Sequence, residues 1–596
     1  MKKWKSMLLL ALSAVLCFGC FTGCKDPDAE LKKNAKYTLA FWSAITPASD
    51  KVMKEVIDTF NRTNTDGIYV NATTRADSSG IGMQLAGSNP PDVVYTEDRY
   101  FKGYALDKYL EPLDKYVSQS QLVDLNDIWQ STVERFRFDP DTGYSGGDNT
   151  LYALPLDNDP TVIYYNKTQF TNQKLNIISV PEEELSAYNS ANGTNYLPHG
   201  FYEYAQNPDA GNKAVTNANA MMQNGNGKYY VFNNLIPMNW DELRELSELF
   251  TKSYGSTADT TYGFMNEWWF SYGWSVGGDC LEWVEDPNKD GNNADAQYMF
   301  SLGEKTSNYL VTKAVEVNGH TYAARELLSY DDKHYVQDHK ADAGIAAAIA
   351  DKTLYPLPSI YDAFVEFCRL SQSTSKYVTD GMKGYGVSPT PSQVNQIGKD
   401  RYFTSGQLAM LCNGLSAAHN IGRAIGKNFE WDVAPLYQYR EYEADGTLKN
   451  VNGTDIVGKK AAHNVVRGYA IPANSKQKDA AWKLIEYLAS AQVQEKLIPA
   501  ELGVPARKSV AKSSAYLDWK ADYVPDNKAA LVEAAEYCTV GDWSYIEDGE
   551  WINPWADVLN TDVRNGSMTL DSFFRHNCIT QTNNILQRYT ARKANG

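Results

Sequence analysis

Apolar and polar residues alternate along the first hundred positions in blocks that predict strands and helices in turn. Residues 37–42 (YTLAFW), 67–72 (GIYVNA) and 93–95 (VVY) are short apolar runs typical of buried strands. A segment that begins at Pro47 has apolar side chains at helical spacing, and residues 81–86 predict a shorter helix. Strands that alternate with helices indicate an α/β fold, with a parallel sheet covered by helices on both faces.

The loops that follow two of these predicted strands carry polar and aromatic side chains. Residues 42–45 (WSAI) end the first strand, and residues 96–99 (TEDR) follow the third. Parallel α/β sheets bind their ligands beyond the carboxyl ends of the strands, so both loops are candidate ligand contacts. The residues expected to contact a ligand in these loops are Trp42, Ser43, Asp98 and Arg99.

Residues 151–167 (LYALPLDNDPTVIYYNK) contain three consecutive polar residues between two apolar runs. The apolar runs predict two short buried strands, and residues 157–159 predict a polar elbow between them. Such an elbow fits a chain that passes from one lobe of a protein to another. It would place the side-chain oxygens of Asn158 and Asp159 at the bottom of the cleft between the lobes.

The second half of the chain continues this pattern with longer insertions. Residues 239–243 (NWDEL) open a helix, whereas residues 170–230 are rich in Asn, Gly, Ala and Tyr, which is typical of inserted loops and short elements. Residues 465–472 (VVRGYAIP) predict a strand that returns to the first lobe. Arg467 in this strand lies near the predicted hinge and is a candidate ligand contact, with a solvated surface arginine as the alternative. Residues 543–589 predict helices packed on the second lobe.

Aromatic residues gather around Trp268 and Trp269. The pair follows residues 262–264 (YGF) and precedes residues 277–279 (GGD). Adjacent side chains of a helix or a strand cannot both face one core. We therefore expect one tryptophan of the pair to face the cleft, and we favour Trp268.

Further short motifs complete a pattern that extends from about Tyr37 to Tyr589. The additional motifs are FW (41–42), PPDVVY (90–95), FTSGQLAMLCNG (403–414), WDVAPL (431–436) and LGVP (502–505). Together with LYALP…YYNK and YGF…GGD, they resemble the motifs of extracellular solute-binding proteins of ABC transporters, family 1, the sugar-binding family that includes maltose-binding protein.

The resemblance implies a two-lobed, periplasmic-binding-protein-like fold of type II, in which two α/β lobes close by a hinge on a ligand in the cleft between them. It implies a carbohydrate ligand, expected to be an oligosaccharide, that is delivered to the permease subunits of an ABC importer, and no catalytic activity. The expected parts are residues 37–156 and 467–524 for lobe one, residues 157–466 and 525–596 for lobe two, and insertions near 170–230 and 285–345.

The resemblance also implies roles for single residues of the cleft. Asp159, eight residues before Lys167, matches a carboxylate that contacts sugar hydroxyls in this family. Asn413 lies at the end of a predicted buried strand, near the cleft. Trp555 best matches a tryptophan that stacks on sugar, and Trp551 is close behind it. Thr96 and Ser416 stand where aromatic platforms are expected, so sugar stacking is expected to depend on Trp42, Trp268 and Trp555.

The N-terminal segment predicts export and lipid anchoring. Three lysines precede an apolar run, residues 7–21, that is too short to span a bilayer comfortably. The small residues before Cys24 resemble a bacterial lipobox, so residues 1–23 would be a signal peptide and residues 24–36 a tether. Cys20 is the second choice, and an ordinary secretory signal is the alternative. A lipoprotein of this kind would be attached to the cell membrane, on its extracellular face or in the periplasm, by acyl chains such as palmitate.

Composition and charge agree with a large exported protein. The net charge of −17 falls to −20 without the first 23 residues, which carry three lysines and no carboxylate, and an acidic chain is a poor nucleic-acid binder. Aromatic faces stack on sugars, and the chain has 40 tyrosines and 14 tryptophans, although most of them must pack in the core. The five cysteines after Cys24 are far apart, which disfavours a metal cluster and leaves one or two disulfides open. We expect a monomer.

One loop has the composition of a calcium site. Residues 286–291 (DPNKDG) match the start of an EF-hand loop, with oxygens from Asp286, Asn288 and Asp290. The twelfth position is Gln297, which cannot supply the bidentate carboxylate. The loop is therefore either a structural Ca²⁺ site or an Asp/Asn/Gly turn in a surface hairpin. No other cofactor is expected.

Two other classes of function stay open at this point. Carboxylates are abundant, so a surface glycoside hydrolase or lyase that acts on the same sugars is the main alternative. A structural or adhesive surface protein is the third class, and it would lack ligand-dependent closure. The chain has no HExxH, GxSxG or P-loop motif, which disfavours the common metal-, serine- and phosphate-dependent enzymes.

Overall fold

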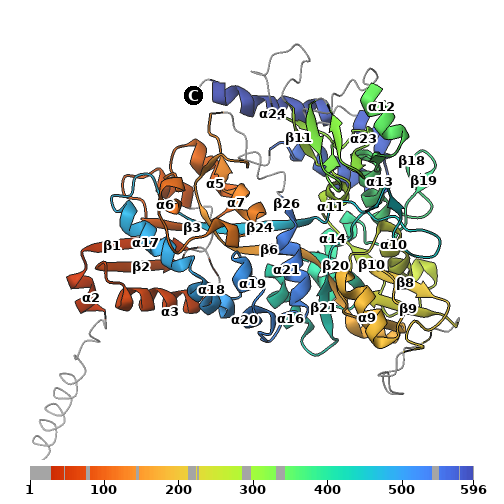
Figure 1. Ribbon diagram of the computed structural model, residues 1–596, viewed down its shortest axis with the longest axis horizontal. Helices are drawn as coiled ribbons and strands as arrows, with labels where there is room; N and C mark the ends of the chain where they lie inside the picture. Colours follow the sequence, from red (N-terminus) through yellow and green to blue (C-terminus); the bar gives the residue numbers. More distant parts are fainter. Residues whose placement is uncertain are drawn as a thin grey trace, which may run out of the picture.

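One mixed sheet runs through the molecule and joins two groups of helices (Figure 1). The computed structural model describes residues 28–594, except for residues 44, 46, 75–80, 142–145, 212–222, 224–226, 285–296, 318, 330–342, 540–549 and 576–577. Within these residues the sheet has ten strands, with the main path β10-β20-β6-β24-β3-β1-β2. The strands of this path are β1 (Tyr37–Ser43), β2 (Ile68–Thr74), β3 (Val93–Glu97), β6 (Leu154–Asn166), β10 (Tyr262–Met265), β20 (Leu408–Gly414) and β24 (Ala462–Ala470).

The first group of elements is the α/β unit that the sequence pattern predicts. Strands β1 and β2 pair in parallel from Tyr37–Ile68 to Ser43–Thr74, and β3 pairs in parallel with the other edge of β1. Helix α3 (Pro47–Thr63) lies against this sheet and buries apolar side chains at helical spacing, namely Met53, Val56, Ile57 and Phe60. The other helices of this unit include α4 (Ile81–Leu85), α5 (Asp98–Leu106), α6 (Asp114–Val117), α7 (Gln130–Arg135), α17 (Lys478–Leu488) and α18 (Ala491–Leu497).

Strand β6 crosses from the first group of elements to the second without interruption. The predicted polar elbow at residues 157–159 is therefore wrong, because these residues belong to one strand of 13 residues. The return strand β24 pairs antiparallel with β6 from Leu154 to Pro160, and β25 (Val504–Pro505) pairs with Asp157 and Asn158. These partners, more than 300 residues away in the sequence, satisfy the backbone of the polar residues and keep it extended.

Two main hydrophobic cores lie on either side of this crossing. The first takes side chains between Leu39 and Leu156 and between Val466 and Ala506. The second contains most buried side chains between Val162 and Ala462 and those of the C-terminal helices, and it also includes Trp129. The lobe boundaries expected from the sequence stay predictions. The side chains of the expected lobe one that pack in the second core are Val504, Val510, Ala511 and Tyr516, together with Trp129 and Ile498.

The second group of elements surrounds the far part of the sheet. Strands β20 and β21 (Trp431–Ala434) pair antiparallel with β6, and β10 runs parallel to β20. Its helices include α10 (Trp240–Leu249), α11 (Phe270–Ser275), α13 (Ile360–Ser371), α14 (Pro391–Ile397), α15 (Lys399–Thr404), α16 (Ala418–Ile425), α20 (Ser514–Leu517) and α21 (Lys528–Glu536). The C-terminal part is helical where it is described, as predicted, and forms α22 (Asn553–Val558), a π turn (Leu559–Val563), α23 (Leu570–Arg575) and α24 (Cys578–Ala594).

The two expected insertions form small sheets where they are described. Strands β7 (Leu175–Ile178), β8 (Phe201–Tyr204) and β9 (Tyr229–Asn233) make a three-stranded sheet with a small core of its own. In the second insertion, β11 (Leu281–Val284) and β12 (Gln297–Phe300) form an antiparallel pair. Strands β13 (Tyr309–Val311), β16 (Leu327–Leu328) and β17 (Leu354–Pro356) form another three-stranded sheet.

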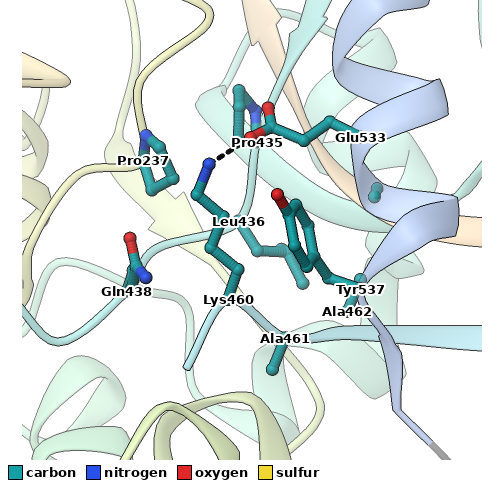
Figure 2. A pocket seen from close by; sticks show the side chains of 10 residues that line it. Pro237, Pro435, Leu436, Gln438, Lys460, Ala461, Ala462, Glu533 and Tyr537 are labelled. Atoms are coloured by element: carbon teal, nitrogen blue, oxygen red, sulfur yellow. Dashed lines mark hydrogen bonds and ion pairs between the residues drawn. The ribbon is translucent and has the colours of Figure 1, made fainter. Parts of the chain in front are cut away.

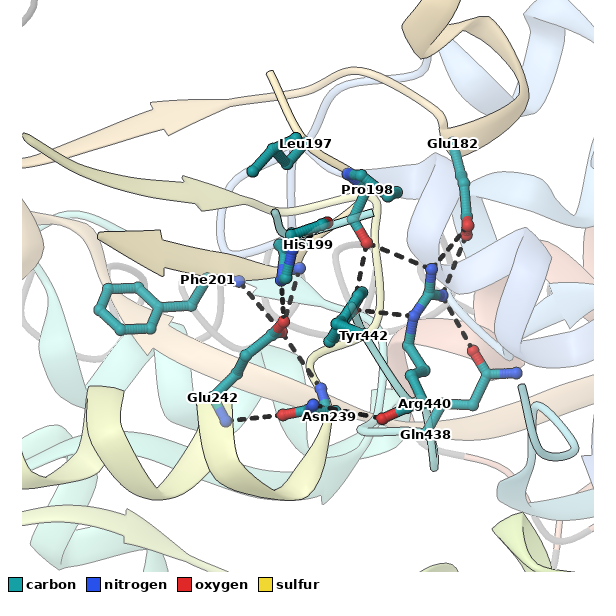
Figure 3. A network of polar contacts seen from close by, with 12 residues as sticks. Glu182, Leu197, Pro198, His199, Phe201, Asn239, Glu242, Gln438, Arg440 and Tyr442 are labelled. Atoms are coloured by element: carbon teal, nitrogen blue, oxygen red, sulfur yellow. Dashed lines mark hydrogen bonds and ion pairs between the residues drawn. The ribbon is translucent and has the colours of Figure 1, made fainter. Parts of the chain in front are cut away.

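A buried polar network fastens the first insertion to helix α10 (Figure 3). Asn239 caps the helix, and its side chain accepts a hydrogen bond from the backbone N–H of Glu242 (2.8 Å). The Glu242 carboxylate contacts Nδ1 of His199 (2.5 Å) and accepts hydrogen bonds from the backbone N–H groups of Gly200, Phe201 and Asn239. A carboxylate that caps its own helix therefore also holds the segment that leads into β8.

Candidate functional site

Arg467, Asp157 and Tyr95 form a cluster of hydrogen-bonded side chains where β6 and β24 pass between the two cores. Arg467 of β24 donates from Nε to Oδ1 of Asp157 (2.7 Å) and from a second nitrogen to the carbonyl of Leu502. The hydroxyl of Tyr95 donates to the other oxygen of Asp157 (2.6 Å). Burial raises the pKa of Asp157, and Arg467 opposes this shift. Arg467 therefore joins β24, β6 and the loop before β25 and is not a solvated surface arginine. The ligand contact expected of Arg467 stays a prediction.

Asn158 points away from solvent in the same region. Its side chain is fully buried, donates from Nδ2 to the carbonyl of Val504 (3.4 Å) and accepts from Nδ2 of Asn464 (3.2 Å). Both ends of this amide are thus occupied by the strands next to β6. The ligand contact expected of Asn158 stays a prediction, and its burial favours a structural role in the crossing.

The carboxyl ends of β1 and β3 form one candidate ligand edge. Ser43 ends β1 and is buried, whereas Trp42 before it is half-buried. Arg99, just beyond β3, is exposed, and its Nε forms an ion pair with Oε2 of Glu97 (2.7 Å). The topology therefore brings together the two loops that the sequence pattern selected, at neighbouring strand ends.

Asp98 lies at the same edge but is 1% exposed, in a buried ion pair with Arg135 of α7. Arg135 also donates to the carbonyls of Asn464 in β24 and Thr539 in β26 (Cys538–Thr539), a strand that pairs with β24. This arginine joins the first core to the return strand β24 and to β26, and the sequence analysis did not identify it. No local motif marks it, because its partners are 37 to 404 residues away.

The carboxyl ends of β10 and β20 form the second candidate edge. Near the end of β20, Asn413 donates from Nδ2 to Oδ1 of Asp400 (2.9 Å), whose pKa is raised by burial. Beyond β10, Glu267 forms an ion pair with Lys399 (2.9 Å). These four groups are half-buried, so they form an edge of paired polar side chains that water still reaches.

Asp159 links this second edge to the crossing strand. Its Oδ1 accepts a hydrogen bond from the backbone N–H of Ser416 (2.7 Å), and the side chain lies beside Gly414. Among the described residues, no group donates to its Oδ2. A half-buried carboxylate with one oxygen still available can accept a hydrogen bond from a ligand.

A pocket adjoins Asp159 through Ser416. It lies between Ser416 and His419 of the second group and the segment from Ile498 to Gly503, and Nδ1 of His419 lies 3.3 Å from Oε2 of Glu501 across it. Its aromatic lining, which the sequence analysis missed, consists of Tyr516, Trp519 and Tyr523.

The tryptophans expected to stack on sugar differ in exposure. Trp268 is half-buried, and its ring lies parallel to Phe270 (centroids 5.5 Å apart). Trp269 is 5% exposed and packs edge-on against Trp555 (4.5 Å). Trp268 is therefore the more exposed of the two adjacent tryptophans, as expected for neighbouring side chains that cannot both face one core.

Trp551 and Trp555 have no exposed surface, so neither offers a face to a ligand in this conformation. Trp555 packs against Trp269 and Phe300, which come from distant parts of the chain, and against the nearby Trp551. The expectation that these two residues present a stacking face is not met here, because Trp551, in the turn before α22, and Trp555, in α22, both pack in the second core. Their contact with a ligand stays a prediction that this burial disfavours.

His463 lies next to the ring of Trp268, at a centroid distance of 6.4 Å. Its Nδ1 is 3.4 Å from Oγ1 of Thr161 in β6. Burial, together with the charge of Arg135, lowers the pKa of His463 to about 3, so the imidazole is neutral at physiological pH.

A separate small pocket lies within the second group of elements (Figure 2). Its walls include Pro237, Pro435 and Leu436, and its charged residues, Lys460 and Glu533, form an ion pair with each other. None of the residues expected to bind a ligand lines it, so it is not a candidate site.

Two predicted sites lie outside the described residues, namely the lipidated Cys24 and the possible calcium ligands Asp286, Asn288 and Asp290. Within the described residues, no group of three or more His, Cys, Asp or Glu side chains could hold a metal ion. The cysteines described there as free are Cys280, Cys368, Cys412 and Cys578, all buried. No helix in the described ranges is both long and apolar enough to cross a membrane.

Comparison with known protein families shows to which family the chain belongs. The model of the family described as bacterial extracellular solute-binding protein matches residues 55–525. The chain belongs to this family. The family suspected from the sequence motifs is therefore confirmed.

Solved structures of solute-binding proteins share the fold. An ABC substrate-binding protein of Listeria monocytogenes, in complex with cycloalternan, matches with a TM-score of 0.51 and 16% identity, over 92% of this chain and 99% of that one. The sugar-binding protein MalE of Xanthomonas citri matches with a TM-score of 0.52 and 15% identity, over 94% and 98% of the two chains. No curated protein sequence matches. The likeness confirms the two-lobed α/β fold of type II for this solute-binding protein.

Proposed function

We propose that this solute-binding protein is the lipid-anchored component of a carbohydrate ABC importer. It binds an oligosaccharide between two lobes that close by a hinge, acts as a monomer and passes its ligand to the permease subunits. The family assignment supports a binding role, and the two similar structures are of a protein in complex with cycloalternan and of a sugar-binding protein.

The observation that carries the proposal is the environment of Asp159. Its available carboxylate oxygen lies at a polar edge that also holds Asn413 and Asp400, and the half-buried ring of Trp268 follows the neighbouring strand β10. A carboxylate forms charge-assisted hydrogen bonds with hydroxyl groups, and an aromatic face packs on the C–H face of a sugar ring. Such a combination suits an uncharged polyhydroxyl ligand.

A panel of oligosaccharides tests the proposal by thermal and urea unfolding of the protein. A cognate ligand at about a hundred times its dissociation constant should stabilise the folded state by about 2.7 kcal/mol. Chromatography of the same mixtures shows whether the sugar stays intact. Cleavage of the sugar would support the alternative of a glycoside hydrolase or lyase, and the absence of any stabilising oligosaccharide would reject the proposed ligand class.

Replacing Asp159 with alanine should weaken oligosaccharide binding while the fold persists. Each charge-assisted hydrogen bond that is lost should reduce the binding free energy by about 1.5–3 kcal/mol. Titration calorimetry measures the change. The matched control is Asp380→Ala in the exposed turn between β18 (Tyr377–Thr379) and β19 (Met382–Lys383), which should bind normally. Equal affinity of the Asp159 variant and the control would reject the assigned role.

Replacing Trp268 with alanine should also weaken binding, because a sugar would lose the aromatic face. We expect a loss of about 1–3 kcal/mol, the range for apolar burial of a large side chain. Trp268→Phe keeps an aromatic ring and should retain part of the affinity, whereas Tyr377→Ala on exposed β18 should bind normally. Ligand titration of tryptophan fluorescence and calorimetry give the comparison. If the alanine and phenylalanine variants bind as tightly as the unmodified protein, stacking on Trp268 is excluded.

Replacing Cys24 with alanine should release the protein from membranes into the medium, because the lipid would have no attachment site. Fractionation of cells followed by immunoblotting measures the distribution. Cys20→Ala is the matched control and should stay in the membrane fraction. The opposite outcome, with the Cys20 variant released and the Cys24 variant retained, would move the lipid to Cys20.

A further inference from the structure

A groove at the far edge of the first lobe carries positive charge on a strongly acidic protein. It lies where β1 and β2 begin, next to the start of α17, and its lining includes five lysines and three carboxylates. The protein as a whole has a net charge of −17. We call this feature the lysine groove; its lysines are Lys36, Lys115, Lys476, Lys478 and Lys483.

The carboxylates of the groove do not neutralise it. Glu111 pairs with both Lys115 (2.9 Å) and Lys478 (2.6 Å), so one negative charge serves two positive ones. Lys36 and Lys476 are exposed, and neither has a carboxylate partner among the described residues. A concave surface with an excess of one charge concentrates the field and attracts ligands of opposite charge.

The N-terminal segment fixes where this groove can lie relative to the proposed anchor. Helix α2 (Ala29–Asn34) is adjacent to the groove, since the side chain of Lys32 lies over the ring of Tyr69 in β2 and the backbone N–H of Lys36 donates to the carbonyl of Gly67 (2.8 Å). Figure 1 shows α2 at one end of the molecule, beside the starts of β1 and β2. Five residue steps separate Cys24 from Ala29, and even a fully extended chain of that length spans at most about 18 Å.

We infer that the lysine groove binds the phosphate groups of anionic phospholipids in the membrane that carries the anchor. The inference rests on the proposed lipid anchor at Cys24, because the short segment after this cysteine brings the groove close to the bilayer. Attraction of lysine to an anionic surface acts within about one Debye length, roughly 8–10 Å at physiological salt, so it requires such proximity. Lysine binds phosphate as a compact point charge and needs no special geometry.

This contact orients the whole protein. Strand β1 starts at the groove and ends at Ser43 on the candidate ligand edge, and its seven residues span roughly 20 Å. The first lobe would therefore stand on the membrane by the edge where its parallel strands begin. The candidate ligand edge would lie on the side of that lobe away from the lipid.

Fluorescence quenching in vesicles tests the orientation. The lipidated full-length protein would be reconstituted in vesicles of phosphatidylglycerol and phosphatidylcholine that carry a headgroup quencher. A fluorophore at Asn474→Cys, beside the groove, should be quenched strongly, and one at Asp380→Cys, on the β18–β19 turn, should not. Quenching at position 474 should fall several-fold in phosphatidylcholine alone and at high salt.

Charge variants separate the groove from the tether. The triple variant Lys36→Gln, Lys476→Gln and Lys483→Gln should lose most of the quenching at position 474 and keep its sugar affinity. The matched control, Lys376→Gln, Lys383→Gln and Lys427→Gln, removes three exposed lysines from the second lobe and should behave like the unmodified protein.

Three outcomes would overturn the inference. Unchanged quenching in the groove variant, or equal quenching in vesicles of phosphatidylcholine alone, would show that the tether alone sets the position, with the lipid anchor intact. A chain that carries no lipid by mass spectrometry would overturn the anchor and this inference together. Sugar affinity, measured separately, reports on the ligand proposal in each case.

Discussion

Replacing Arg135 with methionine should lower the free energy of unfolding by about 3–5 kcal/mol, which is the usual effect of removing one partner of a buried ion pair. The side chain of Arg135 is fully buried, and its partner Asp98 is 1% exposed. In the variant, the Asp98 carboxylate stays in the interior without its counter-charge. Two backbone carbonyls, of Asn464 and Thr539, also lose a donor. Urea unfolding followed by circular dichroism measures the loss.

The double variant Asp98→Asn, Arg135→Met is the control for this interpretation. It removes both charges, so it should recover a large part of the free energy of unfolding that the Arg135 single variant loses. A single variant that loses less than about 1 kcal/mol would mean that water reaches Asp98 and solvates it, and the buried pair would then have little weight.

Replacing Glu242 with alanine should have a similar effect, again about 3–5 kcal/mol, because a buried carboxylate leaves several donors behind. The Glu242 side chain is 8% exposed and lies against His199. Three backbone N–H groups, two of them in the segment that enters β8, also depend on it (Figure 3). We expect lower stability and faster proteolysis of the first insertion.

Glu245→Ala is the matched control for Glu242, since it removes the same side chain three residues further along α10. Glu245 is 58% exposed and pairs with Arg244 at the surface, so the change should stay within about 0.5 kcal/mol. If the Glu242 and Glu245 variants were equally stable, the polar network around Glu242 would not contribute to stability as proposed. Hydrogen exchange at β8 and β9 would show whether the loss is local to the insertion.

The elements of the first lobe could be predicted because their signals are local. The helical spacing of Val56, Ile57 and Phe60 and the apolar runs of β1 to β3 each depend on a few neighbouring residues. The elbow at residues 157–159 was predicted wrongly for the opposite reason. Three polar residues in a row are typical of a turn, and only pairing with β24 and β25 makes them a strand.

In the candidate site, too, the features that depend on neighbouring residues could be predicted, and the contacts between distant segments could not. Local motifs located Asp98 and Trp268 just after β3 and β10, and Asn413 near the end of β20, whereas Asp159 lies in the middle of β6. Their partners could not be predicted, since a pair such as Asp98 with Arg135 forms only after the chain has folded.

The burial of Trp555 depends in the same way on aromatic rings of distant segments. Its indole packs against Phe300, which lies 255 positions earlier in the chain, and against Trp269. A family motif marks the position of such a tryptophan but not the side chains that cover it. Sequence analysis could therefore place the residue near the site and could not predict its exposure.

The uninterrupted passage of β6 between the two cores bears on how one core can rotate against the other. A loop bends freely, but a strand held by β24 on one edge and β25 on the other can change its shape mainly by twisting. Arg467 and Asp157 add a charged cross-link at the same level. Rotation of one core against the other would therefore twist the paired strands. The twisted strands would resist this change and return the cores toward one angle. The sheet, rather than the length of a linker, would then set how far the two cores can open.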